Sequence, residues 1–244
     1  VRLVGSEMCI RDSIRTNIEG TYNVLESAKL RQTEKIIITS TSETYGTAQT
    51  IPIDESHPLV GQSPYSASKI SADQLALSYH LSFDSPITIA RPFNTYGPRQ
   101  SSRAIIPTIF SQAIIGDTLT LGNLSPTRDL TYVDDTCKGF LEIANHPDLN
   151  GEVINIGSNQ EISIGALAEL IKEIVGKDLN ITESQDRLRP EKSEVDRLLC
   201  DNSKICKLTA WKPEIGLKDG LRNVYNWMQS IDLNQIYKAD RYNV

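Results

Sequence analysis

The sequence predicts an α/β protein, with a parallel sheet covered by helices on both faces and a smaller part on its C-terminal side. From residue 14 to about 157, short apolar runs rich in β-branched residues alternate with longer segments of helical periodicity. This alternation is typical of parallel sheets, because a connection between parallel strands must cross the sheet, usually as a helix. After residue 157 the pattern changes to an amphipathic helix, short extended pieces and a last helix near 217–230. We expect this part to lie beside the sheet as a lid or binding lobe.

The first helix is expected to run from residue 14 to about 30 and to lead into a buried strand. Residues 1–13 show no periodicity of either kind, and we expect them to be a non-native leader. Mostly apolar residues then recur at helical spacing and are followed by the run Ile36–Ile38. The residues of the helical pattern are Ile14, Ile18, Thr21, Leu25 and Ala28.

The second helix is expected to begin at Ser63 and Pro64, because serine caps a helix and proline fits its first turn. It should continue to about residue 82 with apolar side chains on two sides, so that one side packs on the sheet and the other on a second chain. The helices near 14–30 and 64–82 therefore predict a homodimer. The apolar residues are Ile70, Leu77 and Leu81 on one side and Leu75 and Tyr79 on the other.

The remaining elements continue the alternation. We expect a strand at 87–91, helices at about 103–115 and 134–146, and a strand at 153–156. We divide the chain into the leader, a sheet domain over 14–157 with interwoven segments of the lobe, and a lobe over 158–244. The helix that opens the lobe is marked by Ile164, Leu167, Leu170, Ile171 and Ile174.

The composition argues against several classes of function. Of the 244 residues, 39% are apolar, and the net charge is −6 with no basic stripe, so we expect no nucleic-acid partner. No apolar run approaches the roughly 20 residues that span a bilayer, and we expect no membrane association and a cytoplasmic location. The four cysteines and three histidines show no metal-ligand spacing, so we expect no metal site.

Two titratable residues of the second helix are the first candidates for chemistry. Tyr65 and Lys69 are four residues apart, which places them on one face of a helix within mutual reach. A free tyrosine has a pKa of about 10, but an adjacent ammonium group favours the phenolate and lowers that pKa. The pair predicts an acid/base tyrosine, although taken alone it also fits a surface pair without function.

Polar residues follow two of the predicted strands at their carboxyl ends. The run 39–46 follows the first strand, and the run 91–99 ends the next strand along the chain. Open α/β sheets bind ligands at the carboxyl ends of their strands. We therefore expect both runs to meet Tyr65 and Lys69 at one crevice, where hydroxyl groups can bind a sugar oxygen.

Four segments of the chain carry more specific motifs. They are T-S-T-S-E-T-Y-G at 39–46, S-P-Y-S-A-S-K at 63–69, R-P-F-N-T-Y-G-P-R at 91–99 and R-D-L-T-Y-V-D-D at 128–135. In this order they resemble the extended short-chain dehydrogenase/reductase family, within it the nucleotide-sugar epimerases and 4,6-dehydratases, and most of all the NAD-dependent 4,6-dehydratases of legionaminic acid synthesis. The resemblance implies a partial Rossmann-like doubly wound parallel sheet with a smaller C-terminal α/β lobe that binds the substrate.

The resemblance also implies roles for the residues that match the family's motifs. Thr41 matches the catalytic hydroxyl residue, Tyr65 the acid/base, and Lys69 the residue that lowers the tyrosine pKa and holds the nicotinamide ribose. Together they would oxidise a sugar at C4, the tyrosine taking the hydroxyl proton while a hydride passes to the nicotinamide. The cofactor side would be completed by Thr39, Arg91 and Pro92.

Glu43 stands where epimerases of this family usually carry a small residue and 4,6-dehydratases carry a carboxylate. Once C4 is a ketone, a carboxylate can remove the C5 proton while water leaves from C6, and hydride return to C6 gives a 4-keto-6-deoxy sugar. Some dehydratases have aspartate where this chain has Ser42, so the acid for the leaving hydroxyl stays open, and Glu43 can serve in both roles. A 4,6-dehydratase is implied, with a 4-epimerase as one alternative and a non-catalytic nucleotide-binding or scaffold protein as another.

A nucleotide-diphosphate sugar, the expected substrate, needs cationic side chains, and guanidinium groups bind phosphate in bidentate geometry. By the resemblance, Asn94 and Arg128 match positions that contact this substrate, and Arg189 matches a later phosphate-binding arginine. Arg103 is a further candidate, and we expect Ser42 to lie near the sugar.

The chain departs from the family in one respect. It contains no glycine-rich turn of the kind that binds a dinucleotide pyrophosphate. By comparison with the family, we expect the chain to begin at the fourth helix and to be N-terminally truncated. NAD is the expected cofactor, and NADP stays open because the discriminating residues would lie in the first half of the fold.

Overall fold

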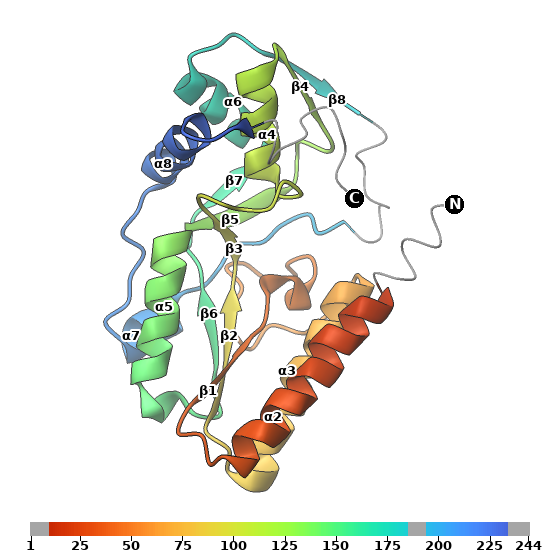
Figure 1. Ribbon diagram of the computed structural model, residues 1–244, viewed down its shortest axis with the longest axis vertical. Coiled ribbons are helices and arrows are strands. Elements are labelled where there is room, and N and C mark those ends of the chain that lie inside the picture. The colour runs from red at the N-terminus through yellow and green to blue at the C-terminus, as the bar shows by residue number, and fades with distance from the viewer. Residues whose placement is uncertain (1–9, 185–193, 234–244) are drawn as a thin grey trace.

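The computed structural model describes residues 10–184 and 194–233 and contains a parallel sheet with a second lobe beyond its strand ends (Figure 1). The sheet has the strand order β1-β2-β6, and all its pairs are parallel. On one face of the sheet, helix α3 contacts β2, and α2 packs against α3. On the other face, α5 contacts β1 and β2 (Figure 1). The predicted doubly wound α/β arrangement is confirmed. The bounds are β1 Ile36–Thr39, β2 Ile87–Pro92, β6 Val153–Ile156, α2 Gly20–Leu30, α3 Pro64–Phe83 and α5 Val133–Asn145.

Isoleucine side chains make the core of this sheet. Ile36 lies opposite Ile87 and Ile89 opposite Val153 in the parallel register, and β-branched side chains suit a pleated, buried surface. The strand isoleucines are buried against Leu25 of α2. The strands predicted in these three places, and the helix predicted before the first of them, are confirmed.

The first helix begins earlier than expected and contains an irregular turn. Residues 10–13 are helical, and the π-helical turn η1 (Ile14–Glu19) joins them to α2. Residues 10–13 therefore extend the helix, and the non-native origin of the leader stays a prediction. Residues 1–9 lie outside the described residues.

Helix α3 begins at the predicted position and brings the candidate pair to the site. The Ser63 hydroxyl accepts from the Ser66 amide at 3.1 Å, and the Ser66 hydroxyl accepts from the Ser63 amide at 3.0 Å, which is a capping box. Pro64 occupies the first helical position. This start places Tyr65 in the first turn and Lys69 one turn further along the helix.

The apolar surface expected to meet a second chain is partly covered within this chain. Helix α3 contacts η1 and α2, and Tyr79 is buried, whereas Leu81 is 83% exposed. A homodimer through these helices stays a prediction. The exposed apolar residues of the helix pair are Tyr22, Val24, Leu30, Leu81 and Phe83.

The second lobe consists of small sheets and helices around one apolar core. In this lobe β3 pairs with β5 in parallel, β5 pairs with β7 in antiparallel orientation, and β4 pairs with β8 in parallel. The predicted helices are confirmed, and β7 and β8 lie where short extended pieces were expected, whereas β3, β4 and β5 were not predicted. The bounds are β3 Asn94–Tyr96, α4 Ile105–Ile115, β4 Thr118–Leu121, β5 Thr127–Tyr132, β7 Glu161–Ser163, α6 Ile164–Val175, β8 Asn180–Glu183 and α8 Leu217–Gln229.

Residues from both sides of position 157 build this lobe. Leu119 and Leu130 share one core with Leu167 and Leu221. The chain passes from the sheet into the lobe between β2 and β3, so the carboxyl ends of the strands face the lobe (Figure 1). Within the described ranges, no helix has the length and apolar content to cross a membrane. The remaining elements are η2 Ser42–Tyr45, η3 Pro147–Leu149 and α7 Ser203–Leu208.

Candidate active site

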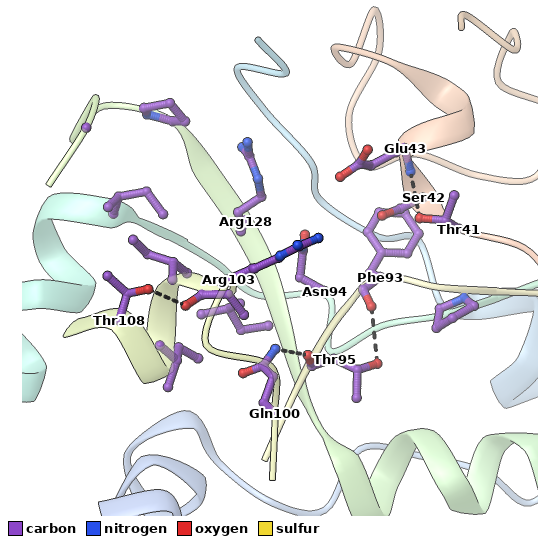
Figure 2. A pocket seen from close by; sticks show the side chains of 18 of the residues that line it. Thr41, Ser42, Glu43, Phe93, Asn94, Thr95, Gln100, Arg103, Thr108 and Arg128 are labelled. Carbon is purple, nitrogen blue, oxygen red and sulfur yellow. Dashed lines mark hydrogen bonds between the residues drawn. The ribbon is translucent and has the colours of Figure 1, made fainter. Parts of the chain in front are cut away.

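A cavity of about 520 Å³ lies where the sheet meets the second lobe. Its lining comes from the segments after β1 and β2, from the first turn of α3, and from α4, β4 and β5 of the lobe. Figure 2 shows Thr41 and Glu43 at one side of this cavity, with Arg103 and Arg128 facing it from the lobe side. The position agrees with the general rule that open α/β sheets bind ligands at the carboxyl ends of their strands.

The structure brings most of the predicted site residues together, but not all of them. Arg189 lies outside the described residues. Thr39, Lys69 and Arg91 do not line the cavity, whereas the lining includes Thr41, Ser42, Glu43, Tyr65, Pro92, Asn94, Arg103 and Arg128.

A short 3-10 turn, η2, presents Thr41 and Glu43 to the cavity. Thr41 caps this turn, and its hydroxyl oxygen accepts from the Glu43 amide at 3.3 Å. The Thr44 hydroxyl donates to the Thr41 carbonyl oxygen at 2.7 Å. The turn ends at Gly46, which has a φ of 65°, and a Cβ there would meet the Gln62 side chain. The polar run after β1 therefore has a defined shape.

Tyr65 lines the same wall of the cavity as this turn. Burial raises the pKa of the Tyr65 phenol, the nearby Glu43 carboxylate raises this pKa further, and hydrogen bonding with Thr41 lowers it. The Glu43 carboxylate therefore lies close enough to Tyr65 to act on the phenol. Three of the four residues predicted to be catalytic thus share one wall.

The predicted effect of Lys69 on the Tyr65 pKa stays a prediction, because the Lys69 amine is directed to the backbone here. The Lys69 ammonium donates to the Thr39 carbonyl oxygen at 2.5 Å, and the pKa of Tyr65 is raised rather than lowered. Burial lowers the pKa of Lys69 itself, whereas the Asp73 carboxylate raises it. The amine therefore lies at the end of β1, directed to the backbone.

Arg91 is another predicted site residue that does not line the cavity. Its side chain is buried beneath the cavity, where it forms an ion pair with Asp73 at 2.8 Å and donates to the Tyr45 hydroxyl at 3.0 Å. These bonds hold the guanidinium group in the interior of the protein, and its predicted contact with the cofactor stays a prediction. Pro92, the next residue, does line the cavity.

The lobe wall carries groups suited to an anionic ligand. Arg128 donates to the Thr127 carbonyl oxygen at 2.9 Å and forms an ion pair with Glu194 at 3.3 Å. Arg103 is exposed at the same cavity. Asn94 also lines the cavity, and its side-chain oxygen is buried without a hydrogen-bond partner among the described residues.

The sequence did not predict several polar residues of the lining, among them Glu194 and Gln100. Glu194 reaches the cavity from a segment with no helical or strand periodicity, five positions after Arg189. Gln100 follows the run 91–99 and donates to the Thr95 carbonyl oxygen at 2.8 Å. Gln100 could have been predicted from its position directly after the motif at 91–99. Glu194 could not, because only the folded lobe brings it to Arg128.

The two walls together suit a ligand with hydroxyl groups at one end and negative charge at the other. Hydroxyl, carboxylate and phenol groups stand at the sheet side, while guanidinium groups stand at the lobe side. No group of three or more His, Cys, Asp or Glu side chains placed to hold a metal ion is found in residues 10–184 and 194–233.

Comparisons with known proteins agree with this geometry. Residues 10–224 match the family described as GDP-mannose 4,6 dehydratase. The low-salt glycan biosynthesis protein Agl12 of Haloferax volcanii is 34% identical over 209 residues, which are 85% of this chain and 66% of that protein. The chain spans about two thirds of the length of that relative.

Two solved structures show the same fold. A dTDP-glucose 4,6-dehydratase from Bacillus anthracis, in complex with NAD, is 30% identical with a TM-score of 0.79, and the match covers 89% of this chain and 68% of that one. A UDP-glucuronic acid 4-epimerase from Bacillus cereus, in complex with UDP-glucuronic acid and NAD, is 32% identical with a TM-score of 0.83, over 89% of this chain and 68% of that one. Both reaction types thus occur among proteins that share this architecture.

Proposed function

Because the chain belongs to the GDP-mannose 4,6 dehydratase family, within the nucleotide-sugar dehydratases and epimerases, we propose that it supplies the catalytic wall and the substrate lobe of an NAD-dependent nucleotide-sugar 4,6-dehydratase. The observation that carries the proposal is the placement of Glu43 beside Tyr65 and Thr41 in one cavity. Oxidation at C4 needs an acid/base group, and elimination across C5 and C6 needs a second one. The cavity wall offers both.

The residues at the end of β1 fit the nicotinamide end of NAD. The Lys69 amine lies at the Thr39 carbonyl oxygen, and Tyr65 and Pro92 line the adjoining cavity. In this position Lys69 would hold the ribose hydroxyls. Bound NAD supplies the hydride acceptor and a positive charge that favours the Tyr65 phenolate. The pyrophosphate is assigned to no residue of this chain, because its sequence contains no glycine-rich turn.

The first chemical step belongs to Tyr65 and Thr41. The Tyr65 phenolate takes the proton of the C4 hydroxyl as hydride leaves C4, and the Thr41 hydroxyl orients that oxygen through a hydrogen bond. Since burial and Glu43 raise the pKa of Tyr65, the bound cofactor has to offset both effects for the phenolate to form near neutral pH.

The second step belongs to Glu43. Its carboxylate takes the C5 proton, which the C4 ketone has made acidic, and the C6 hydroxyl leaves as water. Ser42 is 2% exposed and carries no acidic proton suited to the leaving group, so we assign the protonation of that hydroxyl to Glu43 as well. Hydride return to C6 and proton return to C5 complete a 4-keto-6-deoxy sugar.

The lobe wall would hold the nucleotide part of the substrate. Arg128 and Arg103 are placed for the diphosphate, and the unpartnered oxygen of Asn94 for a sugar hydroxyl or amide. Arg189 remains a proposed phosphate ligand. A nucleotide-linked N-acetylglucosamine, the substrate type of the legionaminic acid enzymes, is the first kind of compound to test, and UDP-N-acetylglucosamine is one example. A homodimer and a cytoplasmic location belong to this proposal too.

A 4-epimerase is the second candidate, since a UDP-glucuronic acid 4-epimerase is among the structural relatives. The product of the complete gene should be incubated with NAD and, in separate reactions, UDP-N-acetylglucosamine, dTDP-glucose and GDP-mannose. Mass spectrometry separates the outcomes, because a dehydratase product has lost one water and an epimer has unchanged mass. An epimer as the sole product would overturn the dehydratase proposal.

The variant Glu43→Gln tests the role of the carboxylate. We expect the dehydration rate to fall by about 100-fold, within the range for removal of a general acid/base, while formation of reduced nicotinamide from the C4 step persists. Glu173→Gln is the matched control, because Glu173 is an exposed carboxylate of α6 that pairs with Lys218 and does not line the cavity. Unimpaired dehydration by Glu43→Gln would remove Glu43 from the mechanism.

A further inference from the structure

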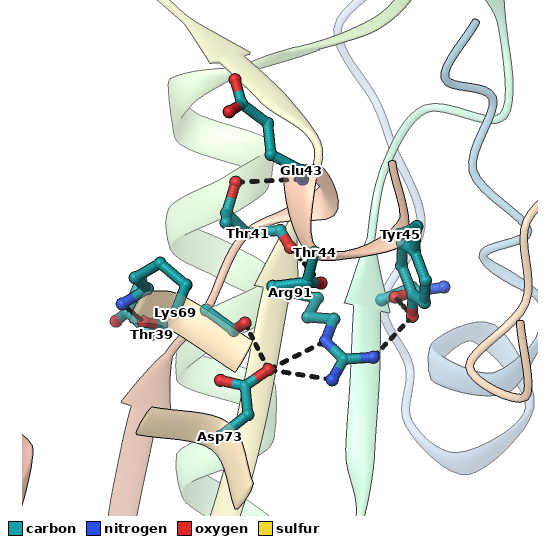
Figure 3. A network of polar contacts seen from close by, with 10 residues as sticks. Thr39, Thr41, Glu43, Thr44, Tyr45, Lys69, Asp73 and Arg91 are labelled. Atoms are coloured by element: carbon teal, nitrogen blue, oxygen red, sulfur yellow. Dashed lines mark hydrogen bonds and ion pairs between the residues drawn. The ribbon is translucent and has the colours of Figure 1, made fainter. Parts of the chain in front are cut away.

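A buried ion pair lies directly beneath the turn that carries Thr41 and Glu43 (Figure 3). Asp73 of α3 and Arg91 of β2 are 0% and 2% exposed, and one Asp73 oxygen accepts from two guanidinium nitrogens, at 2.8 and 3.2 Å. Neither side chain lines the cavity. The family resemblance implies a contact of Arg91 with the cofactor, but it gives no role to the ion pair between Arg91 and Asp73.

The pair is bonded to both ends of the turn. The Ser40 hydroxyl donates to the same Asp73 oxygen at 2.6 Å, and Arg91 donates to the Tyr45 hydroxyl at 3.0 Å. Ser40 and Tyr45 flank residues 41–44, which include the catalytic candidates. The ion pair therefore connects the two ends of the loop to α3 and β2.

Tyr45 extends the connection to the third strand of the sheet. Burial raises the pKa of Tyr45 to about 12, so its hydroxyl stays protonated and donates to the Asn155 side-chain oxygen at 2.8 Å. The backbone amide of Asn155 donates in turn to the Glu55 carboxylate at 2.8 Å. One network thus fixes the loop from α3, β2 and β6.

Asp73 also faces the lysine of the candidate pair. It lies one turn after Lys69 on α3, and its second oxygen is buried without a hydrogen-bond partner in the described part of the chain. Its charge favours the ammonium form of Lys69. One carboxylate therefore acts on the loop with Thr41 and on the lysine proposed to hold the ribose.

Stability alone is a weak reason for such a pair. Removing two charges from water is costly, and apolar replacements of buried ion pairs are often as stable. An ion pair can instead hold a loop in one geometry through directional hydrogen bonds, which apolar packing does not provide. Misplacement of a reacting group by 1 Å can cost about 100-fold in rate.

We propose that Asp73 is a positioning residue which, through Ser40, Arg91 and Tyr45, holds the turn of Thr41 and Glu43 against Tyr65. The proposal rests on the function proposed above for Thr41, Glu43 and Tyr65. It assigns no contact with substrate to Asp73 or Arg91. Their effect reaches the reaction through the loop.

The test uses substitutions that loosen the loop and leave the ion pair intact. Ser40→Ala removes the link at one end, and Tyr45→Phe removes the hydroxyl at the other. Tyr96→Phe is the matched control, because Tyr96 is a buried tyrosine of the lobe whose hydroxyl donates to the Leu217 carbonyl oxygen at 3.2 Å. The melting temperatures of all three proteins report their folding.

The first readout is the titration of Tyr65, followed by NMR of ring-labelled tyrosine in the full chain. Glu43 contributes more to the Tyr65 pKa than Thr41 does, so a loosened turn should lower the titration midpoint in Ser40→Ala and Tyr45→Phe and leave it in Tyr96→Phe. This readout requires no turnover. It therefore stays decisive if the enzyme turns out to be an epimerase or to use another sugar.

The second readout is turnover by the product of the complete gene. We expect kcat to fall about 10-fold in both loop variants, part of the loss that misplacement can cause, with unchanged affinity for UDP because the lobe wall is untouched. Equal Tyr65 midpoints and equal kcat in wild type, Ser40→Ala and Tyr45→Phe would overturn the proposal. A parallel loss of UDP affinity would also overturn it, since that result indicates general damage to the cavity.

Discussion

The two walls of the cavity are built in different ways. On the sheet side, the turn of Thr41 and Glu43 is bonded at both ends to a buried network that includes Asp73 and Arg91. On the lobe side, Arg103 is exposed, and the side-chain oxygen of Asn94 has no hydrogen-bond partner within the described part of the chain. One wall has its polar groups fixed in advance, whereas the other has groups that a ligand can satisfy.

This difference assigns separate tasks to the two walls. Catalytic groups have to be held within a fraction of an ångström, and rigid strand ends with supporting hydrogen bonds provide that precision. Recognition of a diphosphate tolerates movable cationic side chains, because charge acts over longer distances. Substitutions on the sheet wall should therefore change rates, and substitutions on the lobe wall should change affinities.

The largest effect is expected for Tyr65→Phe, which removes only the phenol oxygen. Loss of a general acid/base costs about 100- to 10,000-fold in kcat, and we expect a drop in that range with unchanged affinity for UDP. Rate measurements and calorimetric titration with UDP check both parts. Tyr225→Phe is the control, because its hydroxyl accepts from Gln229 at the surface of the lobe. A Tyr65→Phe protein that loses UDP affinity to the same extent would break the division between the walls.

The sheet and its helices could be predicted from the sequence because local patterns determine them. Isoleucine runs mark β1 and β2, and the Ser63-Pro64 start fixes the register of α3, so Tyr65 was placed correctly in its first turn. The short strands of the lobe, such as β4 with Thr118–Leu121, have no length over which alternation becomes visible. Their pairing depends on contacts between segments far apart in the chain.

Site residues that belong to a sequence motif could be predicted. Side-chain orientations that depend on hydrogen-bond partners from other elements could not. The motifs located Thr41, Glu43 and Tyr65, all of which reach the cavity. The orientation of Arg91 could not be predicted, because it depends on Asp73 and Tyr45, which come from other elements. For the same reason the bond of the Lys69 amine to the Thr39 carbonyl oxygen could not be predicted.

An intermediate effect is expected for Arg128→Ala on the lobe wall. Hydrogen bonds to charged groups contribute about 1.5–3 kcal/mol, so the affinity for UDP should fall by roughly 10- to 100-fold, while the pH dependence of the C4 oxidation step stays unchanged. Calorimetry and stopped-flow detection of reduced nicotinamide measure the two quantities. Arg222→Ala is the matched control, since Arg222 pairs with Asp219 on the exposed side of α8. Unchanged UDP affinity in Arg128→Ala would mean that Arg128 does not bind the diphosphate.

The smallest effect is expected for Glu194→Gln, and its sign sharpens the comparison. The Glu194 and Arg128 side chains are 17% and 14% exposed, and their ion pair spans 3.3 Å within the cavity lining. A carboxylate and a phosphate compete for the same guanidinium group, so removing the charge of Glu194 should raise the affinity for UDP about threefold, a change within the range for a partly exposed ion pair. Glu161→Gln, which breaks the more exposed pair with Arg197, serves as the control. A fall in affinity for Glu194→Gln would mean that Glu194 orients Arg128, and the lobe wall would then be preorganised like the sheet wall.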